Sequence, residues 1–244
     1  MNAVATVPTI LPLRLESVSK TARGLRIIDG VSCEFVGDSR SLILGANGAG
    51  KSVLLRLCHG LLQPSEGKIV WHGANGVDPS HRQAMVFQHP IMLRRSALAN
   101  VIYALKLGRV PRANRRERAA MALARVGLAE IADRPARVLS GGEQQRLALS
   151  RAWALEPEVL FLDEPTANLD PTATRAVEEI IQQIAAAGTK IVMTTHNLGQ
   201  ARRLADEILF IHRGRLLEKS PADRFFTAPA SPEAAAFLKE ELPW

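Results

Sequence analysis

Apolar positions in this chain recur with two spacings, every second residue in some segments and every three to four residues in others. Such alternation is typical of a layered α/β domain. A helix is expected over residues 51–61, and another begins at Asp170, an N-cap residue followed by a proline. Residues 96–133 are expected to be helical, so a helix-rich block should interrupt the sheet. Strands are expected over residues 13–18, 25–35, 41–44, 68–71, 84–87, 159–162, 191–195 and 207–212, the last two closing the core sheet.

Length and composition agree with one globular domain. The chain has 244 residues, 47% of them hydrophobic and 23% charged, and a formal net charge of +7. No uncharged apolar run in the sequence approaches the roughly 18 residues that span a bilayer. Residues 1–12 lack the basic start of a secretory signal and are expected to be a short tail. Cys33 and Cys58 lack metal-site spacing and are expected to be buried thiols in a reducing cytoplasm.

The first chemical motif follows the expected strand at residues 41–44. It fits the pattern G-x-x-x-x-G-K-[ST] between a strand and a helix, and its residues are Gly45, Ala46, Asn47, Gly48, Ala49, Gly50, Lys51 and Ser52. Backbone N–H groups of such a loop surround a phosphate chain, at a helix N-terminus that adds positive charge. Lys51 would reach the β- and γ-phosphates, and the Ser52 hydroxyl would bind Mg²⁺. Val53 stands where a second hydroxyl is frequent, so one phosphate contact is absent.

Two carboxylates end the apolar strand at residues 159–162. The edge of a parallel sheet where strands end is where ligands bind, so Asp163 suits Mg²⁺ through water. Glu164 suits a general base that holds the attacking water. An isolated Asp-Glu-Pro would more often cap a loop before Pro165, and the phosphate loop upstream favours the catalytic interpretation.

A glycine-initiated helix start with a hydroxyl lies at residues 139–146, Leu-Ser-Gly-Gly-Glu-Gln-Gln-Arg. A helix cap between two helices would explain it alone, but together with the two preceding motifs, in the same order, it closely resembles ATP-binding cassette (ABC) ATPases. The resemblance covers residues 13–220 and implies an α/β fold: a P-loop NTPase core of ABC type with an antiparallel β subdomain and an inserted helical subdomain near residues 90–155. Residues 221–244 would form a C-terminal helical extension.

The resemblance also implies site roles. Two copies would dimerise head to tail around two ATP molecules, with Ser140, Gly141 and Gly142 of one copy gripping the γ-phosphate held by the other. Gln88 matches the glutamine that touches Mg²⁺ and water and senses the membrane partner. Asp170 matches the acid of a loop crossing between sites, and His196 matches the switch histidine on the γ-phosphate, although a lone histidine after a strand is more often a core or capping residue.

The family resemblance implies an ATPase that drives a separate permease, as a peripheral protein on the cytoplasmic face of a bacterial inner membrane. A periplasmic binding protein would act on it indirectly. The alternative, an ABC ATPase acting on nucleic acid, usually carries two cassettes or a long coiled coil, and residues 53–138 hold no heptads. No nucleic-acid partner is therefore expected. Segments 56–62, 82–88 and 199–205 are similar to importer subunits for tungstate and related oxyanions, with a transporter for another substrate as the alternative.

Two features leave alternatives open. The family commonly stacks adenine on an aromatic residue after the first strand, and residues 19–22, Ser-Lys-Thr-Ala, offer none. Residues 94–118 concentrate basic side chains, for which a solvated face is the default interpretation and contact with anionic lipid headgroups the alternative. The basic residues are Arg94, Arg95, Lys106, Arg109, Arg112, Arg115, Arg116 and Arg118, against the single acid Glu117.

Overall fold

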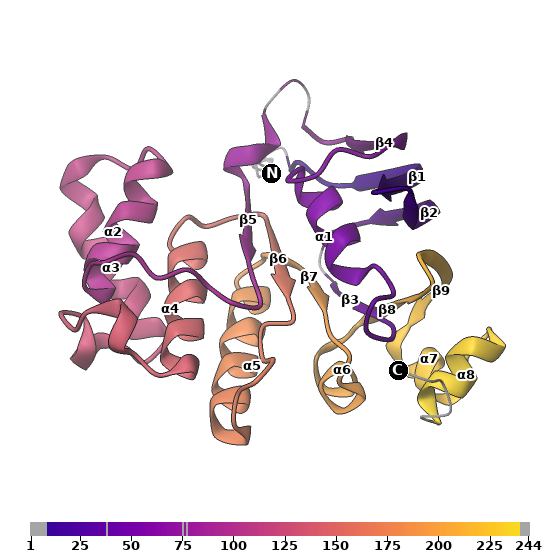
Figure 1. Ribbon diagram of the computed structural model, residues 1–244. Helices are drawn as coiled ribbons and strands as arrows, with labels where there is room; N and C mark the ends of the chain where they lie inside the picture. Colours follow the sequence, from indigo (N-terminus) through magenta and orange to yellow (C-terminus); the bar gives the residue numbers. More distant parts are fainter. Residues whose placement is uncertain (1–8, 38, 75, 77, 240–244) are drawn as a thin grey trace, which may run out of the picture.

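The computed structural model describes residues 9–37, 39–74, 76 and 78–239. The described chain forms a six-stranded sheet flanked by helices and a separate three-stranded sheet beside it (Figure 1). The strands are β1 (Leu13–Ala22), β2 (Leu25–Phe35), β3 (Arg40–Leu44), β4 (Glu66–Trp71), β5 (Gln83–Val86), β6 (Val159–Asp163), β7 (Lys190–Thr194), β8 (Glu207–His212) and β9 (Arg215–Pro221). The α-helices are α1 (Lys51–His59), α2 (Ala97–Leu107), α3 (Arg112–Arg125), α4 (Gly141–Trp153), α5 (Pro171–Ala186), α6 (Leu198–Leu204), α7 (Ala222–Thr227) and α8 (Pro232–Leu238).

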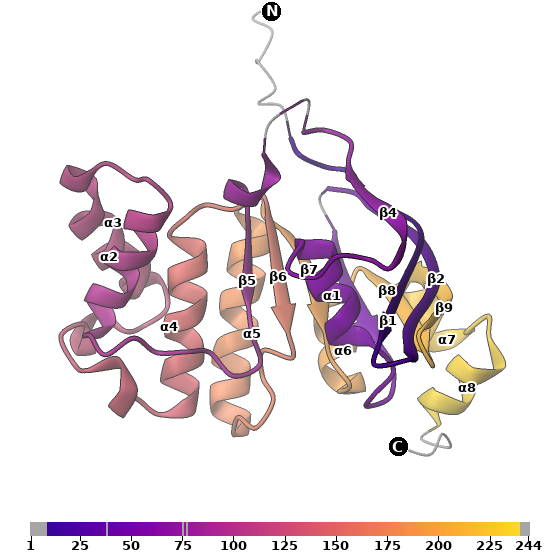
Figure 2. The same cartoon turned by 45° about the horizontal axis from the view of Figure 1, so that its top comes forward.

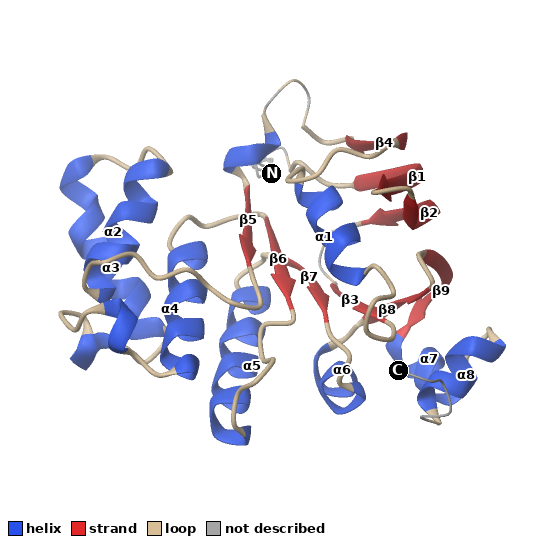
Figure 3. Cartoon of the chain, in the orientation of Figure 1, coloured by secondary structure: helices blue, strands red, loops and turns tan. Residues whose placement is uncertain are grey.

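The large sheet has the strand order β5-β6-β7-β3-β8-β9, parallel except for β9. Its central strands β6 and β7 are buried at every position and apolar in their middle, because both faces of the sheet are covered. On β6, Val159 and Phe161 pack into the cluster that contains α1 and the small sheet, whereas Leu160 and Leu162 pack into the cluster on the opposite face. The phosphate-loop helix α1 therefore lies between the two sheets (Figures 1 and 3).

The small sheet is antiparallel, with the order β2-β1-β4. The expected strand at residues 13–18 continues to Ala22, because a two-residue turn at Arg23 and Gly24, both with positive φ, closes a hairpin with β2. The pairing of β1 with β2 shifts between Lys20 and Thr21, which leaves Ile27 on β2 without a partner. Such a bulge bends the strand and re-aims the side chain.

The expectation that residues 207–212 close the core sheet is wrong. The edge strand β9 follows β8 through a turn at Arg213 and Gly214, again both with positive φ, and pairs antiparallel with it. Its sequence, Arg-Leu-Leu-Glu-Lys-Ser-Pro, is half polar and ends in proline, as an exposed edge requires.

The helix-rich block expected at residues 96–133 contains two α-helices, α2 and α3, separated by residues 108–111, Gly-Arg-Val-Pro. The block lies at one end of the large sheet, with α4 and α5 side by side beneath β5–β7 (Figure 2). Part of its positive charge serves packing: Arg115 donates to the Val110 carbonyl, and Arg118 donates to the Ala154 carbonyl.

Residues outside the sheets complete the core. Ile10 and Leu11, in the segment expected as a tail, are buried, whereas residues 1–8 of that segment lie outside the described part.

Cys58 is buried and Cys33 is partly buried, and burial raises the pKa of the Cys33 thiol to about 12. No helix among the described residues is long and apolar enough to cross a membrane.

Candidate active site

The phosphate loop leaves β3 and enters α1 at the carboxyl edge of the sheet. Its glycines are required by close packing: a Cβ at Gly45 would lie 2.2 Å from the Ile211 carbonyl oxygen, and Gly50 adopts a φ of +101° with Ile28 directly against it. Only glycine permits this approach and this backbone conformation without strain. The loop is thereby held as an open ring of backbone N–H groups at the start of α1.

Lys51 begins α1 and turns back into this ring. Its Nζ donates to the carbonyl oxygens of Gly45 at 2.9 Å and Ala46 at 3.1 Å, and lies 3.6 Å from Oε1 of Glu164. Burial lowers the pKa of Lys51, and the charge of Glu164 opposes that shift. The Lys51 ammonium is thus held at the loop by two backbone carbonyls and one carboxylate oxygen.

Asp163 is a buried carboxylate at the end of β6, 2% exposed, with hydroxyl partners from two other elements. Ser52 Oγ donates to Asp163 Oδ1 at 2.6 Å and Thr194 Oγ1 donates to the same oxygen at 2.9 Å, while an Arg56 nitrogen lies 3.5 Å from Oδ2. The described residues contain no cluster of three or more His, Cys, Asp or Glu side chains that could hold a metal alone. A Mg²⁺ here would complete its oxygen shell with water and phosphate, as this ion usually does.

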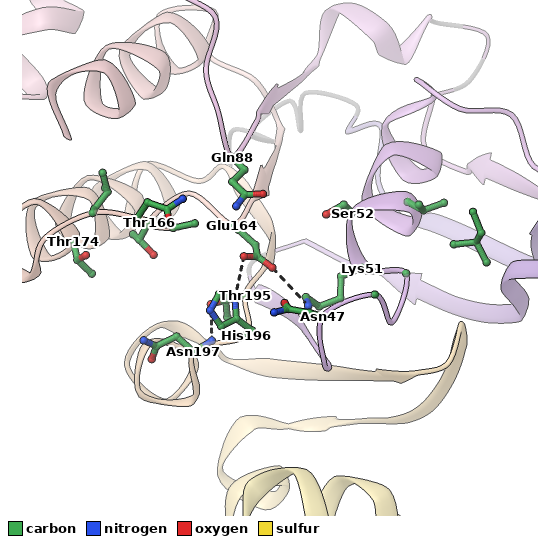
Figure 4. A pocket seen from close by; sticks show the side chains of 17 residues that line it. Asn47, Lys51, Ser52, Gln88, Glu164, Thr166, Thr174, Thr195, His196 and Asn197 are labelled. Atoms are coloured by element: carbon green, nitrogen blue, oxygen red, sulfur yellow. Dashed lines mark hydrogen bonds and ion pairs between the residues drawn. The ribbon is translucent and has the colours of Figure 1, made fainter. Parts of the chain in front are cut away.

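Glu164 and His196 meet across the cleft (Figure 4). His196 Nδ1 lies 3.0 Å from Glu164 Oε2, and the other carboxylate oxygen faces Lys51. Glu164 has a φ of +44°, unusual for a residue with a side chain, and its N–H donates to both oxygens of Thr194. The hydrogen bonds from β7 therefore hold Glu164 in a backbone conformation that directs its carboxylate into the cleft.

These groups surround a cleft of about 780 Å³. Most of its lining comes from the phosphate loop and from the segments after β6 and β7. The lining residues are Ile27, Asn47, Gly48, Gly50, Lys51, Ser52, Val53, Gln88, Glu164, Thr166, Ala167, Asn168, Leu169, Thr174, Thr195, His196 and Asn197. No Phe, Tyr or Trp is among them in the described part of the chain, and Ile27, from the bulge in β2, is the aliphatic side chain contributed by the small sheet.

Sequence reasoning did not single out Thr166, Thr174, Thr195 and Asn197 as site residues. Thr195 could have been found by its place directly before His196, at the end of a buried strand. Thr174 reaches the cleft from the end of the first turn of α5, and that position depends on how α5 packs. No signal along the chain marks it.

The Ser-Gly-Gly segment lies apart from this cleft. Ser140 caps α4 and exchanges hydrogen bonds with Glu143, the capping box of a well-defined helix start. A Cβ at Gly142 would lie 2.7 Å from the Ala173 side chain on α5, so the two helix starts are in contact. Asp170, in the same region, caps α5 by accepting from the N–H groups of Thr172 and Ala173. The cleft of one chain therefore has no contribution from residues 140–142.

A second, mostly apolar groove of about 430 Å³ lies between β5 and α2. Phe87, Ile91 and Leu107 line it and are 39%, 78% and 62% exposed. Gln88, next to Phe87, lines the cleft instead. The segment after β5 thus contributes to both depressions.

The fold and the phosphate loop define a P-loop ATPase. The family model described as ABC transporter matches residues 28–167. The chain is 36% identical to the histidine/lysine/arginine/ornithine transport ATP-binding protein HisP of Salmonella typhimurium, over 94% of this chain and 97% of that protein. It is 35% identical to the tungstate uptake system ATP-binding protein TupC of Peptoclostridium acidaminophilum, over 88% of this chain and 100% of that protein.

Among solved structures, the ATP-binding cassette MJ0796, described as a dimer in a post-hydrolysis state with ADP and Pi, superposes with a TM-score of 0.77 at 25% identity, covering 86% of this chain and 98% of that one. Further relatives are named for phosphate import, glutamine transport and methionine import. The chain belongs to the ABC transporter family and is an ATP-hydrolysing transport subunit. The expected fold class is confirmed.

Proposed function

We propose that this ATPase powers an importer of tungstate or a related oxyanion. The 35% identity to TupC over the whole of that protein supports this cargo. An importer for another substrate is the second candidate, favoured by similar identity to a relative named for amino-acid transport. The contact of Glu164 with His196, opposite Lys51, is the observation that carries the hydrolytic part of the proposal.

In the proposed mechanism the loop N–H groups and Lys51 bind the β- and γ-phosphates of ATP. Ser52, Asp163 and Gln88 would hold Mg²⁺, which supplies positive charge to offset that of the phosphates. The Ser52 hydroxyl donates its hydrogen to Asp163, so the lone pairs of its oxygen remain available to the ion. Asp163 also accepts from Thr194, so the buried carboxylate is satisfied on that side.

Glu164 is proposed as the general base. It accepts a proton from water as the water oxygen bonds to the γ-phosphorus and the bond to the ADP oxygen breaks. His196 orients the carboxylate through Oε2 and contacts the γ-phosphate. Lys51, 3.6 Å from Oε1, opposes the negative charge that gathers on the transferred group.

A second copy of this chain is proposed to complete each site. Ser140, Gly141 and Gly142 form a capped helix N-terminus that does not line their own cleft, which suits an anion held by another molecule. Asn168 and Leu169 line the cleft and lead to Asp170, so that loop would lie where the two copies meet. The dimeric state of MJ0796 supports a head-to-tail pair.

An integral membrane permease is the proposed partner at the apolar groove beside Gln88. Its exposed Phe87, Ile91 and Leu107 fit an apolar segment of that partner. We propose that the chain is a peripheral subunit on the cytoplasmic face of a bacterial inner membrane, with a periplasmic binding protein acting through the permease. We also propose that residues 1–12 form a tail, residues 13–220 the ATPase domain and residues 221–244 a C-terminal extension. We propose no nucleic-acid partner.

Reconstitution tests the cargo. ATP hydrolysis is measured with the chain alone and with its co-purified permease and binding protein in vesicles. The isolated chain should ignore tungstate and molybdate, because coupling requires a site with differential affinity for cargo. The complete system should respond most to tungstate, less to molybdate and least to phosphate. Stimulation by amino acids without any by tungstate would reject the oxyanion and leave the ATPase assignment intact.

A further inference from the structure

A buried polar network connects the two segments that carry Glu164 and His196. Gln200, 1% exposed on α6, donates from Nε2 to Thr166 Oγ1 at 2.8 Å and to Glu178 Oε1 at 3.1 Å. Thr166 lies two residues after Glu164, and Gln200 lies four residues after His196. Arg203 completes the network with two bonds to the Glu178 carboxylate, at 2.8 and 2.7 Å.

The carboxylate of Glu178 fixes the orientation of the Gln200 amide. An ionised carboxylate only accepts hydrogen bonds, so the NH₂ group of the amide must face it. The reverse orientation would place two acceptor oxygens together at about 3 Å in a dry site, which is unfavourable. In the observed orientation Oε1 of Gln200 is buried without a partner among the described residues, a cost that the two bonds from Nε2 offset.

The two segments are also linked directly where the Glu164 N–H donates to both oxygens of Thr194, and each has local bonds of its own. Asn197 caps α6 by accepting from the Gln200 N–H, and Thr195 Oγ1 accepts from the Asn197 N–H. On the other side the Ala167 N–H donates to the Glu164 carbonyl and closes a tight turn after β6. The Gln200 side-chain amide therefore links the turn after β6 to helix α6, beside the cleft.

We propose that Gln200 is a positioning residue for hydrolysis. It holds the segment of Glu164 against the helix that follows His196, and Glu178 keeps its amide in the donating orientation. The inference rests on the proposed roles of Glu164 and His196. Displacement of one catalytic group by about 1 Å can lower a rate by about a hundredfold. Loss of the hydrogen bond between Gln200 and Thr166 should therefore lower turnover. Nucleotide binding relies on the phosphate loop, which this network does not touch.

Replacement of Thr166 by Val removes the acceptor and keeps the side-chain shape. We expect kcat to fall about tenfold in T166V, with the Kd for ATP within twofold of wild type, and Thr166→Ser to restore kcat. Gln200→Leu should lower kcat by a similar factor. The double variant should be no slower than either single variant, because both remove the same tie.

The control variants separate positioning from general destabilisation. Thr189 donates its hydroxyl to the Pro157 carbonyl at the opposite edge of the sheet, so T189V makes the same chemical change far from the cleft. Glu178→Gln should lower kcat about threefold, because an amide at residue 178 no longer fixes the Gln200 amide. E179Q removes the same charge from the next, exposed position of α5. Neither control should change kcat.

The outcomes are distinct. If wild type hydrolyses ATP and T166V matches it, the positioning role is wrong even when Q200L melts at a lower temperature. Equal losses in T166V and T166S, or additive losses in the double variant, also overturn it. If wild type and every variant fail to hydrolyse ATP, the proposed function of the cleft itself fails. Should Q200L not fold, the comparison of T166V with T166S decides.

Discussion

Replacing Glu164 by Gln keeps the shape of the side chain and removes its negative charge. Oε1 of Glu164 lies 3.6 Å from the Lys51 ammonium and Oε2 lies 3.0 Å from His196 Nδ1. An amide can still meet both neighbours through its oxygen and NH₂ group, so the local fold should persist. It cannot accept the proton of the attacking water, and turnover should therefore fall while nucleotide binding remains.

The size of both effects follows from the geometry. Loss of a general base lowers a rate by about 10² to 10⁴, which corresponds to roughly 3–5 kcal/mol of activation free energy. The γ-phosphate must approach Lys51, so it would come within roughly 6 Å of the carboxylate. Like charges at that separation repel by about 1–3 kcal/mol at effective dielectric constants between 80 and 20. The amide removes this repulsion, and ATP should bind about tenfold more tightly.

Single-turnover hydrolysis and equilibrium ATP binding measure the two effects separately, and light scattering with ATP and Mg²⁺ measures assembly. E164Q should accumulate as an ATP-bound dimer. Glu130→Gln, at an exposed position of the helical block, removes the same charge and should behave as wild type. A variant that stayed monomeric and turned over at the wild-type rate would refute the assignment of Glu164.

Lys51→Ala should abolish ATP binding and hydrolysis together, because it removes the main side-chain charge on the phosphates; normal activity in a filter-binding and turnover assay would exclude that role. GTP should compete with ATP within about tenfold, because base stacking worth ~1–3 kcal/mol has no aromatic platform in the described cleft, and a hundredfold ATP preference would contradict this. Burial lowers the pKa of Lys190 from its ordinary 10.5 to about 8. Between these pH values the unfolded chain retains a proton that the native chain has lost, so the unfolding free energy of wild type should rise with pH by up to about 1.4 kcal/mol per unit relative to Lys190→Met. The unfolding free energies of both proteins are measured by urea unfolding at pH 8, 9 and 10. If their difference does not change with pH, the reasoning is wrong.

Features fixed by short-range spacing could be predicted from the sequence. The phosphate loop has its glycines and Lys51 within eight consecutive residues, and Asp163 and Glu164 follow four consecutive apolar residues, so both motifs are evident from the sequence. The hairpin of β8 with β9 is not predicted from the sequence, because β9 has the polar composition of an exposed edge strand. Arg213-Gly214 and Arg23-Gly24 carry the X-Gly signal of tight hairpins, which could have extended both predictions.

Long-range contacts could not be predicted in this way. Gln200, Thr166 and Glu178 lie on three different segments, and only packing of α5 against α6 brings them together. A buried glutamine in an amphipathic helix has no periodic signal that distinguishes it from an exposed one. The same holds for Ile27, whose place in the cleft depends on a one-residue bulge in the pairing of β1 with β2.

The adjacency of Phe87 and Gln88 has a consequence for how such subunits diversify. These neighbouring residues line the groove and the cleft respectively, and the groove-lining side chains Phe87, Ile91 and Leu107 take no part in lining the cleft. If the permease docks at the groove as proposed, substitutions that fit the groove to another membrane protein can accumulate without changing the residues that line the cleft. Relatives with 34–36% identity to this chain are named for transport of phosphate, tungstate and amino acids, as this separation predicts. In an alignment of such relatives, we expect the groove positions to differ between subunits that serve different permeases. The cleft positions should be nearly the same in all of them.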